Sequence, residues 1–172
     1  MGYNLIIGEA CFEGDKEEAY LRVWAEPQAH DGAPVFANDP MTGNSNGRSP
    51  SYSTWADLCR EVGLYGMFYG ENGRRDPYMK GDPDCHRETP ILAEHPGYAA
   101  INAQDVLTIK HALDQHIAKH GDLTPGFRDW NEKDEDAPAN AVECAQRARL
   151  IWLHYWCAWA VENCKWPIIA NS

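Results

Sequence analysis

The sequence predicts an α+β fold, in which an N-terminal antiparallel β-hairpin or small sheet packs against three helices, the C-terminal one long and tryptophan-rich. Three patterns support this prediction. Apolar residues alternate with polar and aromatic ones near the N-terminus, and apolar residues are spaced three and four apart over residues 103–120. A stretch near the C-terminus is almost wholly apolar. At 172 residues the chain has the size of one domain. We therefore expect a single α+β domain over residues 1–172.

The first element is a predicted hairpin. Residues 3–12 are apolar and β-prone, and residues 13–16 carry turn chemistry. In the next run, 19–25, Leu21 and Val23 alternate with polar and aromatic residues. The pattern predicts two antiparallel strands, of which the first is internal because it is apolar on both faces.

The second element is a short helix over about residues 54–62. Ser53 or Thr54 is the predicted N-cap, and Gly63 supplies a stop. Residues 65–69 fit either a strand or an aromatic loop, and the sequence does not decide between them. Residues 98–101 fit a short strand.

Two longer helices follow. Asn102 with Asp105 predicts the start of an amphipathic helix over about 103–120, which stops at Gly121. The last helix is predicted from about Pro138 to Lys165, because a proline at 167 cannot continue it.

The last helix is apolar on all sides for three turns. Between Leu150 and Val161 only His154 is neither apolar nor aromatic. Such a helix must be surrounded, either by elements of its own domain or by a second subunit. A homo-oligomer formed through this helix is therefore one of two arrangements that fit the sequence.

The charge balance limits the class of partner. The net charge is -11, with 26 acidic and 15 basic residues, which excludes binding of a nucleic-acid backbone by bulk electrostatics. A small anion held by a few local arginines, or a basic host protein, stays possible. No run of about 18 apolar residues predicts a membrane span, and no signal peptide is evident, so we expect a cytoplasmic protein.

Residues 27–52 form a long segment rich in proline, glycine and asparagine, and we predict a ligand site there. Glycine and asparagine permit left-handed turns that direct successive N–H groups into one concavity, and the segment leads into a helix N-terminus that favours anions. Two arginines of a later irregular segment would close over the anion. The alternative is a structural loop whose polar groups bond one another, with the two arginines exposed to solvent. The predicted ligand-binding residues are Asn38, Asp39, Asn44, Ser45, Asn46, Arg48, Ser49, Ser51, Tyr52, Arg74 and Arg75.

Two histidines form the candidate metal motif. His116 and His120 are four residues apart on the predicted amphipathic helix, which is the spacing that lets two imidazoles share a metal. A third ligand would have to come from elsewhere, such as His95 or Cys85. Two histidines without a third nearby ligand fall short of a metal site, so we expect no metal and no other cofactor. We expect both histidines to lie at the border of the core, near a helix C-terminus. The sequence assigns no catalytic residue and leaves open whether the protein is an enzyme.

A stylistic resemblance involves three segments: Met1–Ala10, the run from Asn38 to Trp55, and the His95-Pro96-Gly97 turn before the amphipathic helix. They resemble small uncharacterised bacteriophage and prophage proteins, over about the first two thirds of the chain. The resemblance implies an accessory role, such as binding a host factor, a defence component or a small signalling molecule, in the host cytoplasm. It implies no catalytic residues.

The leading functional hypothesis is therefore a non-enzymatic accessory binding protein of phage type, which holds a small anionic or nucleotide-like ligand or a host or defence factor. One alternative is a small hydrolase or metalloenzyme that uses His95, His116 and His120. Another is a protein-interaction or assembly module, in which the acidic surface and the tryptophan-rich helix contact a partner.

Overall fold

The computed structural model describes residues 2–13, 22–36, 43–69, 92, 97–126 and 135–171, and the backbone of 74–75 and 86–87. The helices in this part of the chain are α1 (Tyr52–Glu61), α2 (Tyr65–Phe68), α3 (Ala103–His120) and α4 (Ala141–Asn163). The strands are β1 (Leu5–Glu13), β2 (Arg22–Ala25), β3 (Gly47–Arg48), β4 (Arg74–Arg75), β5 (His86–Arg87), β6 (Gly97–Ala100) and β7 (Pro167–Asn171).

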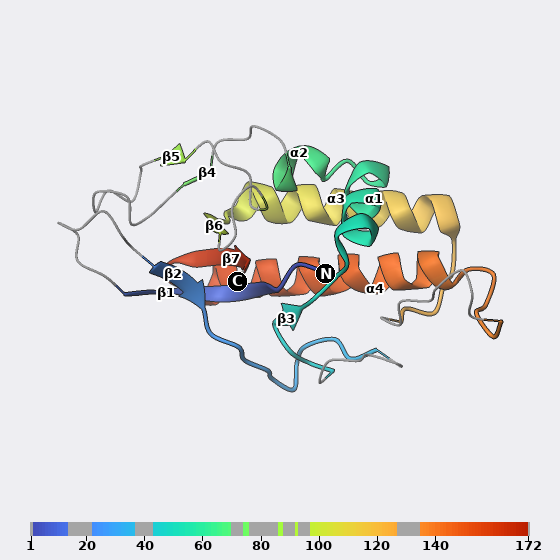
Figure 1. Ribbon diagram of the computed structural model, residues 1–172, viewed down its shortest axis with the longest axis horizontal. Coiled ribbons are helices and arrows are strands. Elements are labelled where there is room, and N and C mark those ends of the chain that lie inside the picture. Colours follow the sequence, from blue (N-terminus) through green and yellow to red (C-terminus); the bar gives the residue numbers. More distant parts are fainter. Residues whose placement is uncertain are drawn as a thin grey trace.

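The main sheet confirms the predicted α+β class and the N-terminal hairpin (Figure 1). Its strand order is β2-β1-β7-β6, and every pairing is antiparallel. The short β3 pairs with the beginning of β1 through Leu5 and Ile6. As predicted, β1 is internal, since it pairs with β7 on one edge and with β2 and β3 on the other. The expected strand near residue 98 is β6, which begins one residue earlier.

Strand β7 is an element that the sequence analysis did not predict. It is the last strand in the chain, yet it lies between β1 and β6 at the centre of the sheet. Ile168 and Ile169 are fully buried, and they point to opposite faces because successive residues of a strand alternate. Ile169 belongs to the main core, while Ile168 packs with Ala10, Val23 and Ala25.

The helices near residue 60 differ from the prediction in two details. The N-cap of α1 is Ser51, whose Oγ accepts from the backbone N of Thr54 at 3.3 Å, so the predicted cap at Ser53 or Thr54 was wrong. Residues 65–68 form the short helix α2, neither of the two conformations considered, so the described residues hold four helices where three were expected. Gly63 has φ of 76° between the two helices, which agrees with its predicted role as a stop.

The predicted start of α3 is confirmed. Asn102 accepts from the backbone N of Asp105 at 3.0 Å, and the Asp105 carboxylate accepts from the backbone N of Asn102 at 3.1 Å. Together the two bonds form a capping box, which satisfies two N–H groups that the helix itself cannot. Gly121, with φ of 66°, follows the last helical residue.

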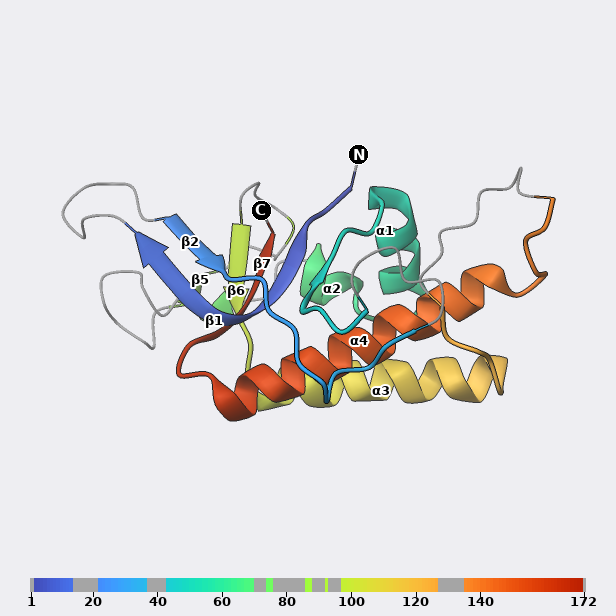
Figure 2. The same cartoon turned by 90° about the horizontal axis from the view of Figure 1, so that it is seen from below.

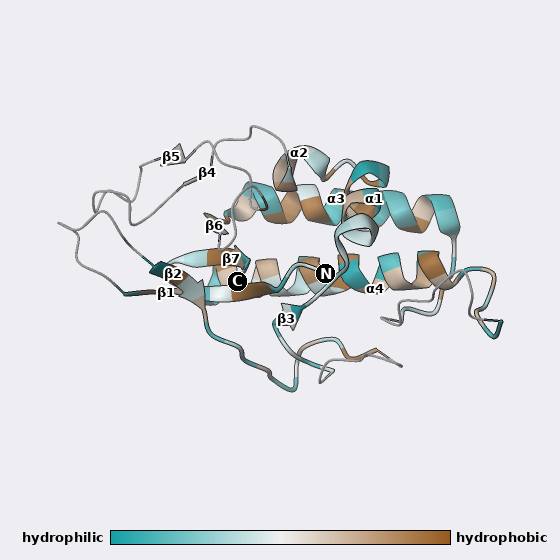
Figure 3. Ribbon diagram, in the orientation of Figure 1, coloured by the Kyte–Doolittle hydropathy of each residue, from teal (hydrophilic) through white to brown (hydrophobic). Residues whose placement is uncertain are grey.

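Helix α4 is the centre of the fold (Figure 2). It runs antiparallel to α3, which covers one side, while the sheet and α1 lie over the other (Figure 2). Trp152, Leu153 and Trp156 are fully buried. Elements of the same chain therefore cover much of this apolar helix, while Ile151 and Trp159 stay partly exposed. Hydrophilic residues colour the outer faces of α1 and the C-terminal end of α3 (Figure 3). None of the helices in 52–68, 103–120 and 141–163 could cross a membrane.

The side chain of Asn46 links the segment after β2 to the sheet through hydrogen bonds. It is fully buried, and Nδ2 donates to the carbonyl oxygens of Ile7 at 2.8 Å and Glu26 at 3.0 Å. Its Oδ1 accepts from the backbone N of Gln28 at 2.8 Å. One amide thus satisfies three backbone groups, one in β1 and two in the segment that follows β2.

We predict that Asn46→Ala lowers the free energy of unfolding by about 3 kcal/mol, because it leaves several buried backbone groups without partners at about 1–3 kcal/mol each. Urea denaturation at pH 7 measures the change. The matched control is Asn44→Ala, which removes one half-buried bond, from Nδ2 to the carbonyl of His30 at 3.1 Å, and should cost about 1 kcal/mol. Equal losses in the two variants would contradict the role assigned to Asn46.

Candidate functional site

The predicted ligand-binding arginine, Arg48, lies inside the protein with 4% of its surface exposed. Its Nη1 donates to the carbonyls of Ser45 at 3.1 Å and Gly47 at 2.6 Å, and its Nη2 donates to the carbonyl of Gly43 at 2.7 Å. The guanidinium carbon lies 5.6 Å from the centre of the Trp152 ring. Arg48 therefore organises its own loop against α4.

Other polar residues of this loop also bond within the protein. The Ser45 carbonyl accepts from Nε1 of Trp152 at 3.0 Å, and its hydroxyl accepts from the backbone N of Gly47 at 3.1 Å. Ser49 bonds the Asn4 side chain at 3.4 Å, and the ring of Tyr52 packs edge-to-face on Tyr3. Ser51 caps α1, and the side chains of Asn44 and Asn46 bond backbone groups. A structural loop, the alternative to a ligand site, accounts for these contacts.

The backbone of Arg74 and Arg75 is not brought to this loop. The backbone of Arg74 and Arg75 forms β4, which pairs with β5 and lies next to β6, whereas β3 is on the far side of β1. Asn38 and Asp39 lie outside the described residues. A small-anion site in this segment stays a sequence-based prediction.

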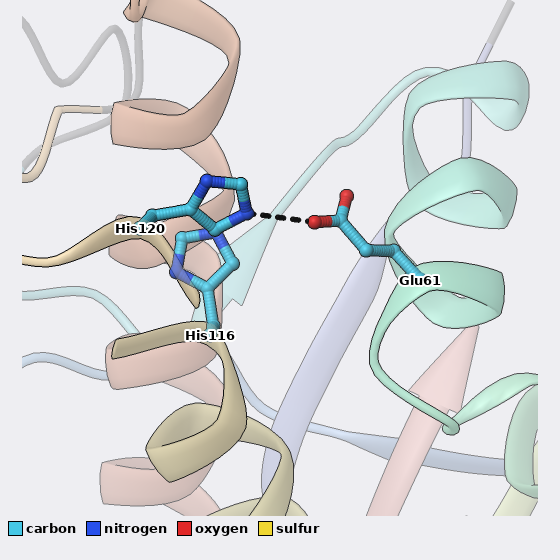
Figure 4. A group of neighbouring side chains, drawn as sticks. All are labelled: Glu61, His116 and His120. Atoms are coloured by element: carbon cyan, nitrogen blue, oxygen red, sulfur yellow. Dashed lines mark hydrogen bonds and ion pairs between the residues drawn. The ribbon is translucent and has the colours of Figure 1, made fainter. Parts of the chain in front are cut away.

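The candidate site lies instead where α1 and α3 end (Figure 4). Glu61, His116 and His120 each offer a metal-ligating atom, and these atoms lie within 4.8 Å of one another. Nε2 of His120 lies 2.8 Å from Oε1 of Glu61, and the two imidazole rings are 4.5 Å apart between centres. The third group that the sequence analysis sought is thus Glu61. The residues proposed there, His95 and Cys85, lie outside the described residues.

The helix ends explain why these charges meet. Glu61 is the last residue of α1, where the partial negative charge of the helix terminus makes a carboxylate unfavourable. Lys119 and His120 stand in the last turn of α3, where positive charge is favourable. Lys119 Nζ contacts Oε1 of Glu61 at 2.9 Å, so the end of α3 compensates the carboxylate at the end of α1.

A continuous chain of hydrogen bonds joins this cluster to α4. Nε of Arg147 donates to Nδ1 of His116 at 3.0 Å, and Nε2 of His116 lies 3.3 Å from Oε1 of Gln146. Nε2 of Gln146 donates to Oε2 of Glu61 at 3.0 Å. Three helices are therefore linked through four side chains, of which His116, Gln146 and Arg147 are buried.

The surroundings shift two pKa values downward. Burial alone would raise the pKa of Glu61, but hydrogen bonds from His120, Lys119 and Gln146 outweigh it and lower the pKa from 4.5 to about 2. Burial lowers the pKa of His116, and electrostatic interactions with His120 and Arg147 act in the same direction, while the hydrogen bond with Gln146 opposes them. At neutral pH the cluster therefore contains a carboxylate and a neutral buried imidazole.

The cluster reaches the surface through an open depression of about 480 Å³. Six residues line it: Glu61, Val62, Gln115, His116, Ala118 and Lys119. A small ion can therefore approach the carboxylate from solvent.

Sequence reasoning found the two histidines by their spacing but missed Glu61, Gln146 and Arg147. Nothing in the sequence places the end of α1 beside the end of α3. Gln146 and Arg147 carried a weaker signal, since they are polar residues at the start of a helix that becomes wholly apolar.

Comparisons of this chain with protein-family models, with curated proteins and with solved structures find no match. The function must therefore be argued from the geometry of the site.

We predict that Glu61→Gln lowers the free energy of unfolding by about 1–2 kcal/mol at pH 7. The folded-state pKa of Glu61 is depressed, so its stabilisation is present above the ordinary value of 4.5 and is lost as the pH falls towards about 2. Urea denaturation of both proteins between pH 7 and pH 2.5 should show the difference shrinking in that window. Asp57→Asn, which removes another α1 carboxylate in an exposed pair with Arg60, should cost less than about 0.5 kcal/mol. A pH-independent difference for Glu61→Gln would contradict the assignment.

Proposed function

We propose that this protein binds a divalent transition-metal ion of the zinc type at the cluster of Glu61, His116 and His120, with Glu61 and His120 as the principal ligands. The observation that carries the proposal is the convergence of one carboxylate and two imidazoles within 4.8 Å, from two helices far apart in sequence. Imidazole and carboxylate are ligands that zinc accepts, and two histidines with one glutamate is a known zinc-binding set.

The distances require only a small closure. Ligands about 2.1 Å from a tetrahedral ion are about 3.4 Å from one another. Nε2 of His120 and Oε1 of Glu61 already lie closer than this, and the third group lies within the 4.8 Å limit. The separations between the ligand atoms therefore need to change by no more than about 1.4 Å.

The electrostatics favour a cation at this place. Glu61 is ionised far below neutral pH, and the C-terminal ends of two helices bring partial negative charge to the same point. The net charge of -11 adds to the local field. Lys119 is 62% exposed at its side chain, so it can leave the carboxylate when an ion replaces it.

Like the leading sequence-based hypothesis, this proposal makes the chain a binding protein. The ligand is now a metal cation in place of a small anion, and the site is the Glu61 cluster in place of the loop before α1. The sequence argument against a metal rested on the lack of a third ligand, and Glu61 supplies one. A site with no more than three protein ligands leaves coordination positions open towards the depression, which suits an exchangeable ion. We propose no reaction for it.

The test is titration of the metal-free protein with Co²⁺ and Zn²⁺. We expect one Co²⁺ per chain, with the visible absorption bands of a tetrahedral or five-coordinate complex, and competition by Zn²⁺. We expect His120→Gln and Glu61→Gln each to weaken binding by about 100-fold or more, because each removes a ligand that already makes close contact.

Two control variants match these substitutions. His111→Gln removes an exposed histidine from α3, and Asp57→Asn removes an exposed carboxylate from α1, and neither residue belongs to the cluster. Both should bind Co²⁺ like the unmodified protein. Absence of stoichiometric binding, or equal binding by the cluster and control variants, would refute the proposal.

A further inference from the structure

We infer that Arg147 limits the metal affinity of this site through the tautomer of His116. It holds His116 with the proton on Nε2 and with the lone pair of Nδ1 engaged in a hydrogen bond, so neither nitrogen is available to a metal. The inference rests on the proposed function for its binding consequence, but the tautomer can be measured without any metal. It makes Arg147 a positioning residue that acts through His116.

The first step concerns the side of His116 that faces α4. A guanidinium can only donate hydrogen bonds, so Nδ1 of His116 must accept the bond from Nε of Arg147. In a neutral imidazole one nitrogen accepts and the other carries the proton. The proton of His116 is therefore on Nε2.

The second step reaches the same result from the other end of the series of hydrogen bonds, which is Glu61. The Glu61 carboxylate can only accept, so Gln146 must turn its amide nitrogen towards it, as observed at 3.0 Å. This orientation presents Oε1 of Gln146 to His116, where it needs a donor. Nε2–H of His116 is that donor.

The consequence for a metal follows directly. The Nδ1 lone pair is engaged by Arg147, and Nε2 carries a proton. His116 can ligate through Nε2 in the usual neutral form only if the proton moves to Nδ1, which would place two N–H groups against each other. Metal-bound histidines normally donate their second N–H to a carboxylate or a carbonyl. Here the partner of the second nitrogen is Arg147, which is a donor where an acceptor is usual.

Arg147 is also unable to move away easily. Its Nη2 donates to the carbonyl of Gly121 at 2.8 Å and to that of His116 at 3.4 Å, which satisfies carbonyl groups at the end of α3. The residue is 5% exposed. The unmodified site should therefore bind an ion mainly through Glu61 and His120, with a small contribution from His116.

The first experiment is ¹⁵N NMR of the metal-free protein, to assign the His116 ring nitrogens. We expect a protonated Nε2 and an unprotonated Nδ1. A protonated Nδ1 would overturn the inference and leave the proposed metal binding intact.

The second experiment is Co²⁺ titration of Arg147→Gln, which offers His116 a side-chain oxygen that can accept from Nδ1–H. We expect affinity to rise by about tenfold or more. Arg60→Gln is the matched control, because it removes the same charge next to Glu61 without touching His116, and it should change affinity less than about threefold. An equal gain in both variants would mean that only charge matters, and would overturn the inference.

A third measurement does not depend on Arg147→Gln folding. In the unmodified background His116→Gln should weaken Co²⁺ binding by less than about threefold, whereas His120→Gln weakens it by about 100-fold. A large loss in both would overturn the inference while supporting the proposed function. Binding of Co²⁺ by neither the unmodified protein nor Arg147→Gln would overturn the proposed function and the binding part of this inference together.

Discussion

The burial of the large apolar side chains of α4, among them Trp152, Leu153 and Trp156, is the constraint on which the rest of this structure depends. A helix with apolar side chains on every side is stable in water only if every side is covered. Here α3 lies along one side, the sheet and α1 cover the other, and the loop that contains Asn46 and Arg48 packs against Trp152. The order of elements around the core follows from this requirement.

The same constraint produces the candidate site. Gln146 and Arg147 are carried into the interior by α4, where an unbonded amide or charge would cost several kcal/mol. Their partners are polar groups at the ends of α1 and α3, the places where helices leave carbonyls unsatisfied. The cluster of Glu61, His116 and His120 is therefore held by groups that the fold must satisfy in any case, so its geometry is fixed by stability as well as by any ligand.

The sequence predicted those parts of the fold that depend on neighbouring residues. The capping box of Asn102 and Asp105, the stop at Gly63 and the hairpin of β1 and β2 are local patterns. Strand β7 was missed because its five residues, which begin with a proline, become a central strand only through pairing with β1 and β6, which are distant in sequence. Two residues of the site were found for the same reason: His116 and His120 are one turn apart, whereas Glu61 meets them only where the end of α1 lies against the end of α3.

The loop before α1 shows why composition alone does not decide between a binding loop and a structural loop. Asparagine, glycine, serine and arginine are suited to hold an anion, but they are equally suited to satisfy backbone groups in a segment without regular structure. Asn46 and Arg48 are buried, and their side chains bond backbone groups of Ile7, Glu26, Gln28, Gly43, Ser45 and Gly47. In the Glu61 cluster the balance differs, because the carboxylate is bonded by His120 and by an exposed lysine that water or an ion can replace. A polar group can serve a ligand only where its present partner is easily exchanged, and among the described residues this condition favours the junction of α1 and α3 over the loop.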